Sequence, residues 1–197
     1  MKTKLQVSKG ALGVLLLAAS SSVWAQNSVL DGHVVGVTDG DTITVLDALN
    51  KTHEIRLAWI DAPETSCHMR RPSRFDEECV EHSQNFGKAA KRNLSGMVYD
   101  QDVRIHVLEG STYGGEIGVV FLGATDVNYQ QVVSGYAWHY QKYAVMTQTP
   151  AQFDLYRNAE QDAKQGGLGL WADKEPLAPW DFRAINRKAG VDYRFPH

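Results

Sequence analysis

Short apolar and β-branched runs alternate with turn residues between positions 29 and 60 of the chain. Three such runs, at residues 32–37, 42–46 and 54–60, are separated by Asp39-Gly40 and Asn50-Lys51. This spacing is typical of strands joined by tight turns, so we expect a three-stranded antiparallel meander. Two later runs, at residues 102–108 and 117–122, bring the number of expected strands to five.

Helical patterns lie between and after these strands. Residues 76–97 are rich in Glu, Lys, Ala and Gln, and this segment has apolar residues at helical spacing: Phe86, Ala90, Leu94 and Met97. A second, shorter helix is expected to start at Asp126, with Val127 and the Val132-Val133 pair facing inward. The third has the clearest start: Thr149 as N-cap, Pro150 at the first helical position and Gln152 completing a capping box.

The third helix is expected to end at Gly166-Gly167, and the chain shows no internal repeat or low-complexity linker. Five strands and about three helices, segregated along the chain, predict one α+β domain built on a small antiparallel barrel. The residues after Trp171 include three prolines, and we expect them to form an irregular tail over the surface.

The first 25 residues have the pattern of a secretory signal peptide. They carry three lysines and no acid, then an apolar run at residues 11–19, and then Val23 and Ala25 at −3 and −1 of a cut after Ala25. A membrane anchor would need about 20 apolar residues, roughly twice this run. We therefore expect three segments: a signal peptide at 1–25, a domain at 26–183 and a C-terminal tail at 184–197. The mature protein is expected to be secreted or periplasmic, monomeric and without stable membrane association.

The charge balance argues against one class of function. The formal charge is −3, with 20 basic and 23 acidic residues, and removal of the three leader lysines makes it −6. A domain that holds nucleic acid by electrostatics alone is expected to have a pI above about 9. The net charge thus argues against a tightly held nucleic-acid partner, although it leaves nucleic acid possible as a substrate.

The two cysteines, Cys67 and Cys79, lie in a polar stretch with eleven residues between them. Outside the cytoplasm they are free to oxidise, so we expect a structural disulfide. Such a bridge would restrain the loop by about 3 kcal/mol. A metal pair or a nucleophile are the alternatives, but two cysteines supply only half of a structural zinc site.

Carboxylates are concentrated in two turns, Asp39-Gly40-Asp41-Thr42 and Asp61-Ala62-Pro63-Glu64. Taken singly, each turn reads as an ordinary loop, since Asp-Gly is a common hairpin signal and Pro fixes the backbone. A meander brings both turns to one end of the barrel, where the carboxylates repel one another. Sites of this kind are stabilised by a hard cation with oxygen ligands. Arg56, on the strand before the second turn, adds a fixed positive charge.

The full pattern, from Asp39 through Val45 and then from Arg56 to Glu64, resembles the first signature of the thermonuclease family, the staphylococcal-nuclease-like proteins. A looser resemblance extends to residues 179–183, so that it covers about residues 29–183. The resemblance implies a five-stranded OB-fold barrel with packed helices. It also implies cleavage of phosphodiester bonds in DNA and RNA, typically with calcium, leaving 3′-phosphate ends.

The resemblance also implies roles for individual residues. Asp41 and Asp61 match calcium-binding aspartates, and Ala62 lies where a backbone carbonyl completes the site for one Ca²⁺ ion. Glu64 matches a general base that takes a proton from the attacking water, and Arg56 matches an arginine that contacts the scissile phosphate. Asp39 is expected to shape the turn.

Two aromatic residues match substrate-binding positions of the family. Tyr113 corresponds to a position near the substrate phosphate, and Tyr143 lies near one that stacks on the base. By contrast, we expect Tyr136, Trp138 and Tyr140 to be strand or core aromatics.

The family's second signature, Asp-Lys/Arg-Tyr-Gly-Arg, is altered here to Ser-Thr-Tyr-Gly-Gly at residues 111–115, so Gly115 stands where a second catalytic arginine is expected. Loss of a transition-state arginine can cost about 10³–10⁵ in rate. Arg70, Arg71 and Arg74 are candidates for a substitute cation, and the alternative is that they are solvated loop charges. The sequence thus predicts a metal-dependent nuclease. The alternatives are a catalytically weakened OB-fold protein that binds single strands and an extracytoplasmic calcium-binding or interaction protein.

Overall fold

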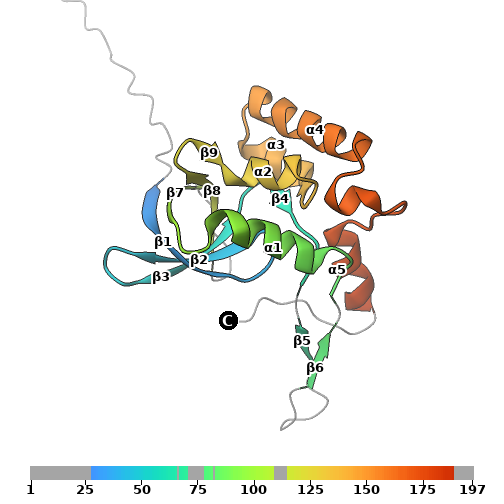
Figure 1. Cartoon of the computed structure of the whole chain (residues 1–197), viewed down its shortest axis with the longest axis horizontal. Coiled ribbons are helices and arrows are strands. Elements are labelled where there is room, and N and C mark those ends of the chain that lie inside the picture. The colour runs from blue at the N-terminus through green and yellow to red at the C-terminus, as the bar shows by residue number, and fades with distance from the viewer. Residues whose placement is uncertain (1–27, 66, 71–77, 82, 109–114, 189–197) are drawn as a thin grey trace, which may run out of the picture.

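The computed structural model describes residues 28–65, 67–70, 78–81, 83–108 and 115–188. Figure 1 shows a small β-barrel with helices gathered against it and one hairpin that extends away from it. The described residues form a closed five-stranded barrel and five α-helices. This confirms the predicted α+β class.

The barrel consists of the five strands expected from the sequence: β1 (Val29–Val37), β2 (Thr42–Asp47), β3 (Thr52–Leu57), β7 (Asp102–Val107) and β8 (Glu116–Leu122). They pair in the order β3-β2-β1-β7-β8, antiparallel throughout. A parallel pairing of β3 with β8 closes the barrel, with Arg56 opposite Ile117. This strand order and closure are those of an OB-fold.

Several short strands extend this framework. β4 (Ile60–Asp61) pairs with β10 (Trp138–His139), and β9 (Thr125–Asp126) pairs with β8. The third expected strand thus ends at Leu57 and not at Ile60, because Trp59 has a left-handed backbone with φ 68° that breaks it. β5 (Cys67–Arg70) and β6 (Glu78–Glu81) form the hairpin that projects from the barrel (Figure 1).

Helix α1 (Gly87–Val98) is shorter than predicted. The expected helix from residue 76 was wrong in its first part, where β6 lies, and residues 76 and 77 are outside the described residues. Phe86, immediately before α1, is left-handed with φ 66°, and this conformation prevents helix extension toward β6. The predicted apolar face is present, because Ala90 and Leu94 are fully buried.

The other two expected helices are confirmed as α2 (Val127–Val133) and α4 (Pro150–Gln165). The capping box of α4 is formed as predicted, with the Thr149 hydroxyl accepting from the Gln152 amide and the Gln152 side chain accepting from the Thr149 amide. The 3₁₀ turn η1 (Gly169–Ala172) follows α4.

Two α-helices were not expected: α3 (Gln141–Thr147) and α5 (Pro179–Lys188). The prediction of an irregular tail after Trp171 was therefore wrong for residues 179–188. Pro179 starts α5 at a position where its missing N–H costs nothing. The helix continues through residue 183, where we expected the domain to end.

The core is continuous from the barrel interior to the helices above it. Its fully buried side chains come from every barrel strand and from α1, α2 and α4, and include Val34, Ile43, Ile55, Leu94, Ile105, Val120, Val132 and Tyr156. None of the helices in the described part of the chain has the length and apolar character of a membrane span.

Candidate active site

The two acidic turns meet at one end of the barrel. The Ala62 amide donates to Asp41 Oδ2 at 3.1 Å, and the Leu57 amide donates to the Asp41 carbonyl at 2.7 Å. Asp41 is 3% exposed and Asp61 is fully buried. The meander therefore brings these two carboxylates together, as the sequence pattern predicts.

The first turn is held by contacts from three sides. The Asp39 carboxylate accepts from the Asp41 amide at 3.0 Å, a local turn that short acidic side chains favour. Gly40 is required by space, since a Cβ there would lie 2.7 Å from the Cβ atoms of Ala62 and Ala90. The buried Gln131 side chain of α2 donates to the Gly40 carbonyl at 2.6 Å and thereby ties the turn to the helical layer.

The second turn is anchored by β10 and by the start of α1. Asp61 pairs with Trp138 across the short two-stranded sheet. Gln84 holds the backbone of Glu64 on both sides, because its amide donates to the Glu64 carbonyl (2.9 Å) and its side chain accepts from the Glu64 amide (3.3 Å). The Glu64 carboxylate lies at the opening of this turn, and its side chain is 14% exposed.

Arg56 connects the two turns. It projects from β3, and its Nη2 donates to Asp41 Oδ2 at 3.3 Å and to Asp61 Oδ1 at 2.9 Å. Its side chain is 27% exposed, whereas those of both partners are buried. The guanidinium therefore compensates the charge of the buried carboxylates and keeps one side open to solvent.

Arg183 of α5 is a second guanidinium that sequence reasoning did not assign to the site. Its Nη1 donates to Asp61 Oδ1 at 3.0 Å and to Glu64 Oε1 at 2.6 Å, while its Nη2 donates to Asp61 Oδ2 at 2.6 Å. The only signal for it was its position at the end of the segment 179–183, where the family resemblance stops. Gln84 and Gln131 had no distinguishing signal in the sequence.

The carboxylates of the site differ in their pKa values. Burial raises the pKa of Asp39, and the adjacent Asp41 charge adds to this effect. Burial also raises the pKa of Asp61 and Glu64, although the hydrogen bond from Arg183 offsets part of the effect at each. At Asp41, burial is outweighed by the Arg56 guanidinium and by several hydrogen bonds, so its pKa is lowered.

These donors fit a hard cation. Asp41 and Asp61 offer carboxylate oxygens and Ala62 offers a backbone carbonyl, which are the ligand types that Ca²⁺ and Mg²⁺ prefer. Within the part of the chain that the structure describes, no group of three or more His, Cys, Asp or Glu side chains is arranged to hold a metal ion. The two aspartates and the carbonyl would thus leave further positions for water or substrate oxygens. Among the residues that the structure describes, four carboxylates gather here with the two guanidiniums of Arg56 and Arg183, so this described part of the site carries more negative than positive groups.

The aromatic residues form a row beside the carboxylates. Tyr143 of α3 is 50% exposed, and its ring lies 4.8 Å from the ring of Tyr140, which in turn stacks on Trp180 of α5 at 4.8 Å and an angle of 11°. Trp138 lies in β10, a strand as expected. Tyr140 lies between β10 and α3, where it precedes the first turn of that helix, and it is neither a strand nor a fully buried core residue.

Several predicted residues cannot be placed in the site. Tyr113, Arg71 and Arg74 are outside the described residues, and of Arg70, Cys67 and Cys79 the structure describes only the backbone, in the β5–β6 hairpin. Gly115 lies just before β8. A Cβ at this position would meet the Glu54 carbonyl at 3.4 Å, an ordinary contact, so a side chain has room there.

Comparisons with known proteins agree with this geometry. The sequence model of a family described as staphylococcal nuclease homologue matches residues 54–173. The chain is 31% identical to a protein named micrococcal nuclease from Shigella flexneri, over 96% of this chain and 99% of the relative. It is 34% identical to a protein named uncharacterized endonuclease from Haemophilus influenzae, over 83% of this chain and 79% of the relative. A protein named ParB from Escherichia coli is 30% identical over 89% of both chains.

Proposed function

The chain belongs to the staphylococcal nuclease family, and we propose on this premise that it cleaves DNA or RNA in a reaction that depends on a divalent cation, Ca²⁺ in the first place. As a member of this family the chain is a hydrolase of phosphodiester bonds. The observation that carries the proposal is the meeting of Asp41, Asp61, Glu64 and Arg56 at one end of the barrel.

Glu64 is the residue suited to activate water. Its pKa is raised by burial, so its carboxylate is more basic than that of an exposed glutamate and is a better proton acceptor. Gln84 fixes its backbone on both sides, which limits the orientations of the carboxylate. In the proposed reaction Glu64 takes a proton from the attacking water as the water oxygen bonds to phosphorus.

Arg56 is suited to bind the phosphate. Phosphoryl transfer requires mainly positioning and charge stabilisation from the protein, and a guanidinium offers paired donors to phosphate oxygens. Asp41, Asp61 and the Ala62 carbonyl would hold the cation, which when bound supplies positive charge against the developing negative charge of the phosphate. The hydrogen bonds from Arg56 to Asp41 and Asp61 hold its guanidinium in position.

The first 25 residues, with their signal-peptide pattern, support a proposal about location. We propose that the mature chain starts after Ala25 and acts in the periplasm or outside the cell, and that Cys67 and Cys79 are disulfide-bonded there. The two cysteines lie on the paired strands β5 and β6, offset by two residues, because Cys67 is opposite Glu81 and Cys79 is opposite Met69. Thiol titration of the purified chain under denaturing conditions, with and without reductant, tests the bridge.

A cleavage assay tests the proposed activity. The mature chain is incubated with plasmid DNA, single-stranded DNA and RNA in Ca²⁺, Mg²⁺ or EDTA, beside Glu64→Gln and a control, Glu175→Gln, which changes an exposed residue. We expect cation-dependent cutting that Glu64→Gln abolishes and Glu175→Gln preserves. Binding of single strands without cutting would support the second candidate, a binding protein, which the glycine at position 115 favours. A chain that neither cuts nor binds nucleic acid would contradict both candidates.

A further inference from the structure

We propose that Arg183 is the second phosphate-binding guanidinium of this active site and that the C-terminal helix α5 supplies it. This inference deepens the proposed function and rests on it for the reaction. It assigns to Arg183 the role that the sequence suggested for Arg70, Arg71 or Arg74.

The contacts of Arg183 place it at the reacting groups. It forms a two-pronged ion pair with Asp61, a proposed cation ligand, and a single hydrogen bond with Glu64, the proposed general base. Asp61 also accepts from Arg56, so both guanidiniums donate to Oδ1 of one buried carboxylate. The buried Asp61 carboxylate offsets the repulsion between these two like charges. Both arginine side chains are also partly exposed at this end of the barrel, where a phosphate group can approach.

Arg183 retains donors for such a ligand. An arginine side chain carries five N–H groups, and the three hydrogen bonds to Asp61 and Glu64 use three of them. Its remaining N–H groups have no partner among the residues that the structure describes. The side chain is 18% exposed, so part of it faces solvent at the mouth of the site. A phosphate oxygen held there would accept from Arg183, beside the water that Glu64 activates.

Helix α5 is docked through two residues that precede Arg183. Trp180, one turn earlier, stacks on Tyr140, whose pKa is raised by burial and by the nearby Asp61 charge. Leu177, just before the helix, accepts from the side chain of Gln84, the residue that also holds Glu64. One glutamine thus ties the general base and the arginine helix to each other.

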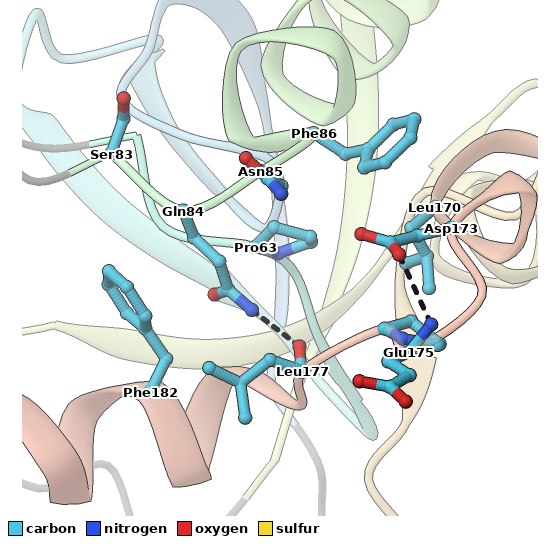
Figure 2. Close-up of a pocket in the computed structure, with 11 residues that line it drawn as sticks. Pro63, Ser83, Gln84, Asn85, Phe86, Leu170, Asp173, Glu175, Leu177 and Phe182 are labelled. Carbon is cyan, nitrogen blue, oxygen red and sulfur yellow. Dashed lines mark hydrogen bonds between the residues drawn. The ribbon is translucent and has the colours of Figure 1, made fainter.

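A cleft of about 240 Å³ lies between α5 and the second turn, and its lining includes Pro63 of the turn and Phe182 of the helix. Figure 2 shows Gln84 directed at Leu177, with Phe182 of α5 nearby and Pro63, the neighbour of Glu64, across from them. These contacts fix the helix at the turn and limit the positions that Arg183 can take. Such restraint is what a transition-state contact requires, because catalysis depends on groups placed in advance.

Three variants of the mature chain test the proposal. Arg183→Gln removes the positive charge, and Arg183→Lys keeps the charge but lacks the paired N–H donors of a guanidinium. Arg187→Gln makes the same charge change at an exposed residue of the same helix. The readouts are kcat and KM on a short oligonucleotide, and the salt dependence of oligonucleotide binding in Ca²⁺. Circular dichroism and thermal unfolding report whether each variant is folded.

We expect Arg183→Gln to lower kcat by about 10²–10³-fold with a smaller change in KM, Arg183→Lys to recover part of the loss, and Arg187→Gln to change neither. Arg183→Gln is also expected to lower the slope of log affinity against log salt by about one. An unchanged or increased kcat in folded Arg183→Gln would overturn the proposal and indicate an arginine that only anchors or shields the site. If Arg183→Gln does not fold, the kcat of Arg183→Lys tests the proposal instead, and a kcat equal to that of the wild type would overturn the proposal.

The binding measurement separates this proposal from the proposed function. If the wild-type chain binds oligonucleotide but does not cut it, the proposed nuclease function fails. A lower slope of log affinity against log salt in Arg183→Gln than in the wild type would still support a phosphate contact at Arg183. An equal slope in Arg183→Gln and the wild type would overturn that contact.

Discussion

The Ala62 amide donates to the Asp41 carboxylate at 3.1 Å, although the two residues are 21 positions apart in the chain. This hydrogen bond locks the turn after β4 to the turn before β2. Asp41 therefore has two tasks, since its charge serves the site and its oxygen holds the second turn. A substitution that keeps the oxygen and removes the charge separates them.

Asp41→Asn is expected to abolish cation binding and to lower the unfolding free energy. The asparagine oxygen can still accept from Ala62, but the ion pair with Arg56, which favours the charged form of Asp41, is lost. A ligand that binds only the folded chain raises its unfolding temperature, by an amount that grows with the logarithm of the ratio of ligand concentration to Kd. Ca²⁺ should therefore raise the midpoint of the wild type and of Glu175→Gln, and leave Asp41→Asn nearly unchanged. An equal Ca²⁺-induced rise in Asp41→Asn would show that the cation binds elsewhere.

Gln131→Met is expected to destabilise the fold by about 1–3 kcal/mol, because it leaves the buried Gly40 carbonyl without its donor. The side-chain volumes are similar, so the loss comes from the hydrogen bonds. Urea unfolding measures the change, and Gln130→Met, on the same helix, is the matched control. A difference between the two variants of less than about half a kcal/mol would contradict the role given to Gln131.

Tyr156→Phe tests the link between the helical layer and the barrel. The Tyr156 hydroxyl donates to Asp126 Oδ2 at 2.8 Å, and Asp126 caps α2 by accepting from the Tyr129 amide. Removal of the hydroxyl leaves a half-buried carboxylate with one partner fewer, which we expect to cost about 1–3 kcal/mol in unfolding free energy. Tyr99→Phe, at an exposed position, should cost nothing measurable. Equal stability of the two variants would argue against the link.

His33 is expected to titrate above its ordinary pKa of 6.5. Hydrogen bonds from its ring to Asp102 (2.9 Å) and Asp100 (3.0 Å) favour the charged form and raise its pKa. A base with a raised folded-state pKa stabilises the fold fully below its unfolded pKa, and this stabilisation is lost as the pH rises through the folded pKa. NMR titration of the ring measures the shift, and Asp102→Asn should reduce it. A His33 pKa at or below 6.5 in the wild type would refute the pairing.

The sequence predicted the barrel well because its signals are local. Each hairpin of the meander is marked by turn residues such as Asp39-Gly40 and by β-branched runs, and α4 by a complete capping box. The start of α1 was misjudged because the three glutamates at 76–81 suit a helix by composition, while the pairing of Cys67 with Glu81 in a hairpin depends on a partner strand. Helix α5 was missed because Pro176 and Pro179 indicated an irregular segment, although Pro179 is the first residue of the helix.

The site was predicted where its residues lie in one contiguous pattern. Asp41, Arg56, Asp61 and Glu64 occur within 24 residues, and β2–β3 pairing brings them together. Gln84, just before α1, Gln131 of α2 and Arg183 of α5 reach the same place by tertiary packing. The sequence does not indicate which backbone group a glutamine side chain will bond in the folded chain. Their roles could be found only from the folded chain.

The ion pairs of Arg183 join residues that are 119 and 122 positions apart. During synthesis, Asp41, Asp61 and Glu64 leave the ribosome long before Arg183 does. A nascent chain therefore carries the carboxylates without one of the two guanidiniums that they face in the finished protein. The order of translation thus delays completion of this cluster until almost the whole chain has been made.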